Sequence, residues 1–209
     1  MAQKINLQPA TLADAGALAQ LWVATFPDKF GPVLGVNAEP VLCDWLRLSQ
    51  RHLQTTTVAK VDEVIVGFMV LETPSAPRPD DGRWLWHALQ LHYGTFGALR
   101  GLLLMLLIDS RHQPSPKEVY IEMLGVNPAW RGRGVAHRLL AHAETVAHMQ
   151  KLNRLSLTVV SDNAAAITLY QKTGFTIRSE YPNRVLTWIT GHRGYYEMVK
   201  QLKQRPSKI

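Results

Sequence analysis

Apolar residues recur at two different spacings along the C-terminal half of the chain, one typical of strands and one typical of helices. Residues 119–126 are apolar and rich in β-branched types, which predicts a buried strand that Asn127-Pro128 ends. From Val135 onward apolar residues recur at helical spacing, so a helix follows. The alternating residues 154–160 predict a second strand. The pattern therefore indicates a strand, a turn, a helix and a strand in succession.

The N-terminal half combines helices with a β-hairpin. A break at Phe26-Pro27 separates two stretches with a helical apolar face, and β-branched residues gather further along the chain. The predicted elements are a strand at 5–9, a helix at 11–26, a loop at 31–40, a helix at 41–48 and a hairpin of strands at 55–60 and 64–71. After residue 175, strands are predicted at 175–180 and 194–200, with a connection at 181–192.

Residues 74–116 form an insertion that proline residues mark at both ends. Its middle is too apolar for a solvated linker, and we expect helices at 83–91 and 95–110, joined near Gly94 and Gly97. The run Leu102–Ile108 is apolar on all sides, which predicts that it is buried against more than one neighbour. Charged residues bracket this run, which is too short to span a membrane.

The composition bounds the class of protein. A chain of 209 residues with 46% hydrophobic residues suits one domain, which we expect to cover 1–202, with 203–209 as a flexible tail. One cysteine, Cys43, excludes an internal disulfide framework and favours a reducing compartment. The N-terminus lacks the apolar core of a signal peptide. We therefore expect a cytoplasmic protein without a membrane partner.

The formal net charge of +7 does not by itself indicate nucleic-acid binding. The basic residues are scattered, and aromatic residues are not interleaved with them as in a stacking platform. The eight histidines do not show the spacing of a zinc site. We therefore expect neither a nucleic-acid partner nor a metal.

The turn after the buried strand carries the chemistry of an anion site. Gly132 and Gly134 let backbone N–H groups converge, the next helix presents its N-terminus, and Arg131 and Arg133 add positive charge. A P-loop is excluded, since Val135 follows the last glycine where Lys would stand. A dinucleotide fingerprint lacks its third glycine and its acidic residue. A phosphate-binding loop of another type is thus predicted.

Arg131, Gly134 and Ala136 meet the pattern Arg/Gln-x-x-Gly-x-Gly/Ala, and here the chain resembles the GCN5-related N-acetyltransferase (GNAT) superfamily. A second family motif follows at the expected separation. Its members are Asn163, Ala166, Leu169, Tyr170, Gly174 and Phe175. The resemblance covers most of residues 117–180. It implies an α/β (α+β) GNAT fold, with a mixed sheet of about seven strands flanked by helices and the insertion between strands 3 and 4.

The resemblance also implies a site for acetyl-CoA in a V-shaped gap between the strands 119–126 and 154–160. The pyrophosphate would bind at Arg131, Gly132, Arg133, Gly134, Val135 and Ala136, and the pantetheine arm would pair with backbone groups of Leu124, Gly125 and Val126. Asn163 matches a position that contacts the coenzyme arm. Its alternative is a purely structural helix cap.

Two residues are candidates for proton transfer. Tyr170 stands at the family's general-acid position, and its phenol would protonate the departing thiolate; the alternative is a core tyrosine. Glu122 lies, by strand alternation, on the same face as Leu124 and Val126, and its carboxylate would take the proton of the amine, directly or through water. A solvated Glu122, with water in the role of base, is the alternative.

These expectations describe an enzyme that moves an acetyl group from acetyl-CoA directly to a primary amine through a ternary complex. The acceptor is a small molecule or a peptide, and the sequence leaves its identity open. A GNAT-fold sensor that holds acyl-CoA without catalysis is the alternative. We expect the insertion at 74–116 to cover the acceptor side of the sheet and to shape the acceptor pocket, and a homodimer interface is the other reading of its apolar surface.

Overall fold

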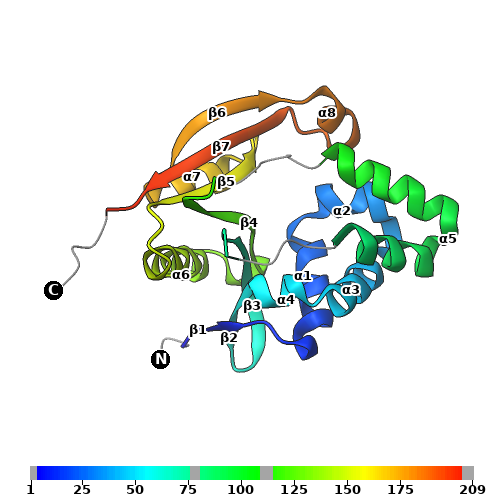
Figure 1. Ribbon diagram of the computed structural model, residues 1–209, viewed down its shortest axis with the longest axis horizontal. Coiled ribbons are helices and arrows are strands. Elements are labelled where there is room, and N and C mark those ends of the chain that lie inside the picture. Colours follow the sequence, from blue (N-terminus) through cyan, green and yellow to red (C-terminus); the bar gives the residue numbers. More distant parts are fainter. Residues whose placement is uncertain (1–3, 76–80, 109–114, 204–209) are drawn as a thin grey trace.

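A computed structural model of the chain describes residues 4–75, 81–108 and 115–203 (Figure 1). The strands of this part of the chain form one seven-stranded sheet in the order β1-β2-β3-β4-β5-β7-β6. Their bounds are β1 Asn6–Pro9, β2 Thr56–Val61, β3 Val64–Glu72, β4 Glu118–Val126, β5 Arg154–Val160, β6 Thr176–Pro182 and β7 Gly194–Gln201. β4 and β5 are parallel, and the other neighbouring pairs are antiparallel. The predicted mixed sheet is thus confirmed.

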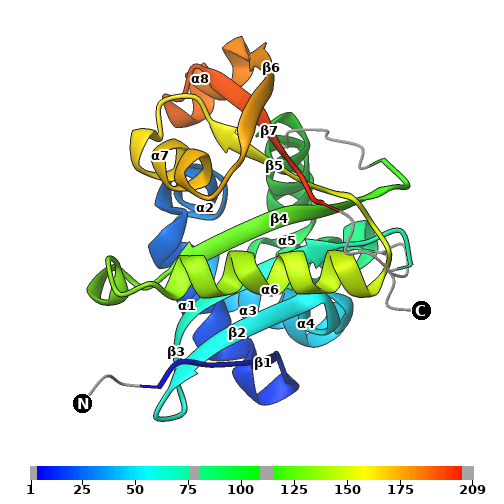
Figure 2. The ribbon, with the colours of Figure 1, turned by 90° about the vertical axis from the view of Figure 1, so that its left-hand side faces the viewer.

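Helices cover both faces of the sheet. On one face lie α1 (Ala15–Thr25), α2 (Pro27–Leu34), α3 (Ala38–Ser49) and α5 (Asp81–Ile108), with α4 (Arg51–Thr55) leading into β2. On the other lie α6 (Val135–Met149) and α7 (Ala164–Lys172). Figure 2 shows α6 crossing in front of β2, β3 and β4 while α1 and α3 lie behind them. A further helix, α8 (Arg184–Thr190), joins β6 to β7, and short 3-10 turns lie at 12–14, 35–37 and 128–130.

The two layers of helices create two hydrophobic cores that share the central strands. Along β3, Phe68 belongs to the core beneath α1 and α3, while Met69 belongs to the core beneath α6. Burial on both faces explains why β3 reads as a continuous apolar run. In the first core, Trp22 packs against Phe30 and Trp45. Phe30 and Trp45 therefore contribute to the packing of this core.

Two connections predicted as loops contain helices. Residues 31–40 belong largely to α2, a 3-10 turn and the start of α3, because Pro27 stands at the first position of α2, where its fixed φ favours a helix. Residues 181–192 contain α8. Asn183 caps it by accepting the N–H of Leu186 at 3.0 Å, and Gly191 ends it at a φ of 82°.

The described part of the insertion is α5, which bends sharply at Gly94, where φ is 64° and ψ is −176°. The predicted pair of helices joined near Gly94 is thus confirmed. α5 packs on α3, α2 and α8. Leu103 and Leu106 are nevertheless more than half exposed, so the expectation that Leu102–Ile108 is buried against several neighbours is not met within one chain. Residues 76–80 and 109–114 of the insertion, and the predicted tail beyond Lys203, lie outside the described residues.

Among the described residues, no helix combines the length and the apolar character that crossing a membrane requires.

Candidate active site

The parallel strands β4 and β5 separate near the middle of the sheet. Their pairing runs from Glu118 opposite Arg154 to Ile121 opposite Leu157, although β4 continues to Val126. A cavity of about 1080 Å³ lies where the strands part, and residues of both strands line it. The edge of β4 beyond Ile121 therefore presents backbone N–H and C=O groups to the cavity, as an extended ligand requires.

The glycine-rich loop forms one wall of this cavity. Gly132 and Gly134 have φ of 75° and 79°, a left-handed conformation that glycine adopts at little cost. A Cβ placed on either glycine would meet no atom within 4 Å, so the space in front of the loop is open. α6 begins at Val135, and its first N–H groups lack partners within the helix. Together with Arg131, which also lines the cavity, this wall suits a phosphate group.

Most of the predicted coenzyme-binding residues line the cavity, namely Leu124, Val126, Arg131, Gly132, Gly134, Val135, Ala136 and Asn163. Arg133 does not, because its guanidinium stacks on the ring of Trp130 at 4.8 Å. Gly125 does not either. A Cβ on Gly125 would lie 2.4 Å from the ring of Phe68, so this glycine allows β4 to approach the core beneath α1.

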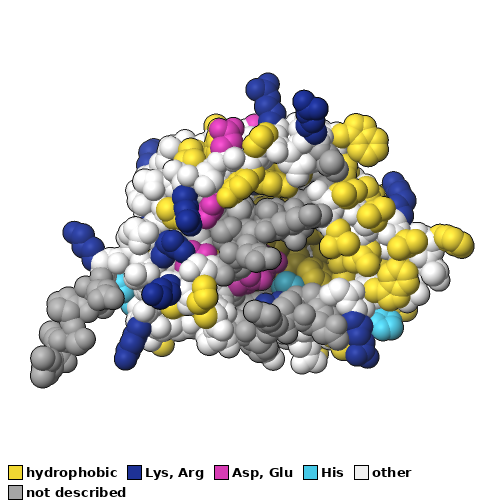
Figure 3. Space-filling model, turned by 45° about the horizontal axis from the view of Figure 1, so that its top comes forward, with side chains coloured by type: hydrophobic (Ala, Val, Ile, Leu, Met, Phe, Trp, Pro, Cys, Tyr) yellow, Lys and Arg dark blue, Asp and Glu magenta, His cyan; other side chains and the backbone are white. Residues whose placement is uncertain are grey.

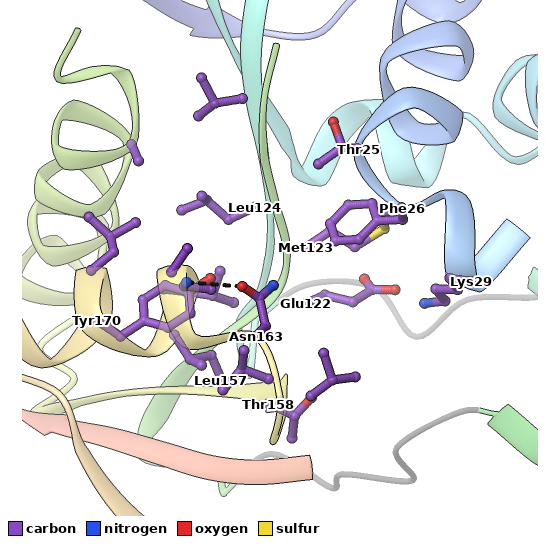
Figure 4. A pocket seen from close by; sticks show the side chains of 18 of the residues that line it. Thr25, Phe26, Lys29, Glu122, Met123, Leu124, Leu157, Thr158, Asn163 and Tyr170 are labelled. Carbon is purple, nitrogen blue, oxygen red and sulfur yellow. Dashed lines mark hydrogen bonds between the residues drawn. The ribbon is translucent and has the colours of Figure 1, made fainter. Parts of the chain in front are cut away.

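Glu122 lies on a different face of β4 from the one predicted. β4 pairs with β3 through Met123 opposite Val70 and Ile121 opposite Leu71, which leaves Glu122 as the extra residue of a bulge. Strand alternation is interrupted there. Figure 4 shows Glu122 and Met123 directed toward Phe26 and Lys29, while Leu124 is directed toward Tyr170. The carboxylate therefore faces the part of the cavity that α1 and α2 bound.

Tyr170 reaches the cavity from α7 and is only 8% exposed. Its ring packs on Phe175 at 5.8 Å between centroids. Burial, with a smaller contribution from nearby Tyr120, raises the pKa of the Tyr170 phenol to about 12. The phenol is therefore protonated throughout the neutral range and can donate a proton to an anion that forms in the cavity.

Asn163 caps α7, and it also lies at the cavity, where the predicted contact with the coenzyme would be made. Its Oδ1 accepts the backbone N–H of Ala166 at 3.0 Å and so caps α7. The residue also lines the cavity, between β4 and Tyr170 in Figure 4. Its side-chain amide is thus held in place by the cap, beside the free edge of β4.

Sequence reasoning missed the side of the cavity opposite the glycine loop. Thr25, Phe26, Asp28 and Lys29 line it from the junction of α1 and α2, and Leu186, Thr190 and His192 line it from α8 and the turn after it. The sequence predicts only a helix end at the first of these segments and a plain connection at the second. The Asn183 cap and the Gly191 end of α8 were signals that a helix stands there.

His192 contacts two carboxylates that come from different segments on this side of the cavity. Its Nδ1 lies 2.8 Å from the carboxylate of Asp162, which precedes α7, and its Nε2 lies 3.5 Å from that of Asp28 in α2. The hydrogen bond with His192 lowers the pKa of Asp162. The imidazole therefore connects the α2 wall to the loop that carries Asn163.

Metal-binding side chains do not gather in the described part of the chain: it holds no group of three or more His, Cys, Asp or Glu residues placed to bind a metal ion.

Comparisons of the sequence and of the fold with known proteins all find acetyltransferases. The family model described as "Acetyltransferase (GNAT) family" matches residues 17–175. The chain is 37% identical over 73 residues to the L-amino acid N-acetyltransferase AaaT of Escherichia coli, a match that covers 34% of this chain and 45% of that relative. The chain thus matches less than half the length of this curated relative.

Solved structures share the fold across nearly the whole chain. An N-acetyltransferase from Staphylococcus aureus superposes with a TM-score of 0.68 at 18% identity, covering 93% of this chain and 99% of that one. The PaiA N-acetyltransferase of Thermoplasma acidophilum, solved with coenzyme A, gives 0.59 at 11% identity, with 95% and 99% covered. Because the family model spans most of the sequence and the fold agrees, this chain belongs to the GNAT family of acetyltransferases.

Proposed function

We propose that the protein is an acetyl-CoA-dependent N-acetyltransferase that transfers the acetyl group directly to a primary amine in a ternary complex. The observation that carries the proposal is one continuous cavity that joins the glycine loop to Glu122 and Tyr170. Its volume of about 1080 Å³ slightly exceeds the roughly 300–1,000 Å³ of ligand pockets, which leaves room for two substrates at once.

Acetyl-CoA supplies the activated acetyl group as a thioester. The open space at Gly132 and Gly134, the charge of Arg131 and the N-terminus of α6 suit its pyrophosphate. The edge of β4 from Glu122 to Val126 suits the pantetheine arm, because its backbone groups face the cavity without a β5 partner in the described register. Asn163 stands beside this edge and can hydrogen-bond the amides of the arm.

Two side chains of this protein then serve proton transfer. The acceptor amine must lose a proton to become nucleophilic, and the Glu122 carboxylate faces the α1–α2 side, where an acceptor would enter. The leaving thiolate must gain a proton, and Tyr170 holds a phenol proton on the other side of β4. The bulge in β4 thus separates a base and an acid by directing Glu122 away from Leu124.

Glu122→Gln is expected to lower kcat/KM more at low pH than at high pH. At low pH the acceptor is an ammonium ion that needs a base, whereas at high pH the amine is already neutral. The pH profile of acetyl transfer, followed by release of the coenzyme thiol, measures this. A loss of equal size at every pH would show that Glu122 serves structure.

The acceptor that the cavity suits best carries a carboxylate near its amine. Lys29 lines the cavity on the same side as Glu122, so an amino acid could place its amine at Glu122 and its carboxylate at Lys29 (Figure 4). The relative AaaT is an L-amino acid N-acetyltransferase, which supports this acceptor class.

Free L-amino acids are therefore expected to be better acceptors than their amides, by roughly tenfold or more in kcat/KM, since a charge-assisted hydrogen bond contributes about 1.5–3 kcal/mol. Lys29→Met should remove this preference and leave the amides unaffected. A thiol-release screen should include free amino acids, their amides, peptides with free N-termini, and peptides whose only amine is a lysine side chain. Equal rates for acids and amides in the wild type would contradict the role of Lys29 without touching acetyl transfer itself.

A sensor that binds acyl-CoA without turnover is the alternative function. It needs no proton donor, so the buried phenol of Tyr170 in the cavity favours the enzyme. Coenzyme binding in calorimetry without thiol release for any amine of the screen would identify the sensor.

A further inference from the structure

The second half of α5, residues 95–108, presents two apolar faces. One face packs within the chain: Ala98 is fully buried, and a Cβ on Gly101 would lie 3.1 Å from Leu89 in the first half of the helix. The bend at Gly94 and the absent side chain of Gly101 thus let the second half fold back against the first. On the other face, side chains of the described residues remain more than half exposed.

That other face is a continuous row of exposed apolar side chains, which we call the outer stripe. Its members and their exposed fractions are Phe96 at 91%, Leu99 at 59%, Leu103 at 56% and Leu106 at 55%. Their spacing of three, four and three residues places them on one side of the helix, opposite Ala98 and Gly101. It is the spacing of a seam that packs against a second helix.

The surface around the stripe is apolar as well. α8 contacts α5, and its Trp188 is 84% exposed. Figure 3 shows hydrophobic side chains gathered over this end of the molecule. The exposed fractions of the outer stripe and of Trp188 correspond to roughly 600 Å² of accessible surface per chain. Two such surfaces together exceed the roughly 1,000 Å² that a specific interface buries. The largest apolar patch of a monomeric protein typically measures about 300–600 Å² and often has a function, so this patch is at the top of that range.

We propose that the outer stripe is the interface of a homodimer, in which the α5 helices of two copies pack together about a two-fold axis. The spacing of the stripe supports a helix as partner, and a second copy supplies the same stripe. A membrane surface is a poorer match, because helices that lie on membranes carry many Lys and Arg residues, whereas residues 95–108 contain only Arg100. Arg100 flanks the stripe, where its guanidinium can stay in water.

The sequence predicts that residues 102–108 are buried, whereas Leu103 and Leu106 are exposed in the single chain, and this interface explains the difference. Residues 102–108 are apolar on all sides because one side faces the chain's own core and the other faces the partner copy. The proposal is independent of the acetyl-transfer chemistry, since none of the described residues of α5 lines the cavity. The sequence predicts that the insertion shapes the pocket; its described part contacts α2 and α8, which line the cavity, and packs most closely on α3.

Sedimentation velocity over a wide range of protein concentration tests the proposal. The wild type should sediment at twice the monomer mass of 23.5 kDa. The double substitution Leu99→Glu and Leu103→Glu should sediment as a monomer, since four carboxylates would face one another in the dimer. Met149→Glu is the matched control, because Met149 is 78% exposed on α6, on the other face of the sheet, and it should remain dimeric.

Circular dichroism and the melting temperature show whether the double variant folds, and Glu is as good a helix former as Leu. If it does not fold, Phe96→Lys decides, because that side chain is almost fully exposed. A monomeric wild type at every concentration would overturn the proposal, and so would a folded stripe variant that stays dimeric. A monomeric wild type that co-sediments with anionic phospholipid vesicles would assign the stripe to a membrane surface instead.

Discussion

Replacing Tyr170 by Phe is expected to lower kcat by roughly 10²–10⁴, the contribution typical of a positioned general acid. The affinity for acetyl-CoA should change by no more than a few-fold, because the phenylalanine ring keeps the contact with Phe175 and only the hydroxyl is lost. The decrease in kcat arises because the leaving thiolate no longer receives the phenol proton. Single-turnover measurements, in which chemistry is observed directly, give the cleanest value.

The pH dependence of the wild type adds a check on Tyr170. A pKa of about 12 means that the phenol stays protonated far above neutrality, so it should contribute no fall in rate below about pH 10. Tyr181→Phe is the matched control, since Tyr181 is half exposed, hydrogen-bonds Glu197 and does not line the cavity. A loss of less than about threefold in Tyr170→Phe would mean that water protonates the thiolate.

Replacing Gly134 by Asp is expected to abolish the binding of acetyl-CoA. The residue has a φ of 79° and precedes the free N–H groups of α6, so the substitution strains the backbone and places a negative charge where the diphosphate would lie. In the wild type, acetyl-CoA at a hundredfold excess over Kd should stabilise the fold by about 2.7 kcal/mol. In the variant this stabilisation should vanish.

Thermal melts with and without acetyl-CoA, together with calorimetric titration, measure this effect. Gly134→Asn separates strain from charge, because Asn tolerates the left-handed conformation and is neutral. It should retain more affinity than Gly134→Asp. Coenzyme affinity that is unchanged in Gly134→Asp would place the pyrophosphate elsewhere and remove the basis of the proposed function.

The sequence by itself determined the features that depend on short stretches of chain. The glycine loop at 132–134, the helix from Val135 and the strands on either side follow from local propensity and hydrophobic period, and the structure has each of them. The bend of α5 at Gly94 was also readable, since glycine marks the position of a φ that other residues avoid. Family motifs then indicated where coenzyme chemistry would be found.

Features that depend on contacts between distant segments were decided only by the tertiary structure. Alternation predicted the wrong face for Glu122 because the bulge arises from the register between β3 and β4, which no single strand encodes. Arg133 turns to Trp130, and the α1–α2 junction and α8 complete the cavity only once the sheet brings them together. The apolar character of Leu102–Ile108 was plain in the sequence. Which of its sides remains exposed was settled by how the bend at Gly94 folds α5 back on itself, because burial is a property of neighbours and not of composition.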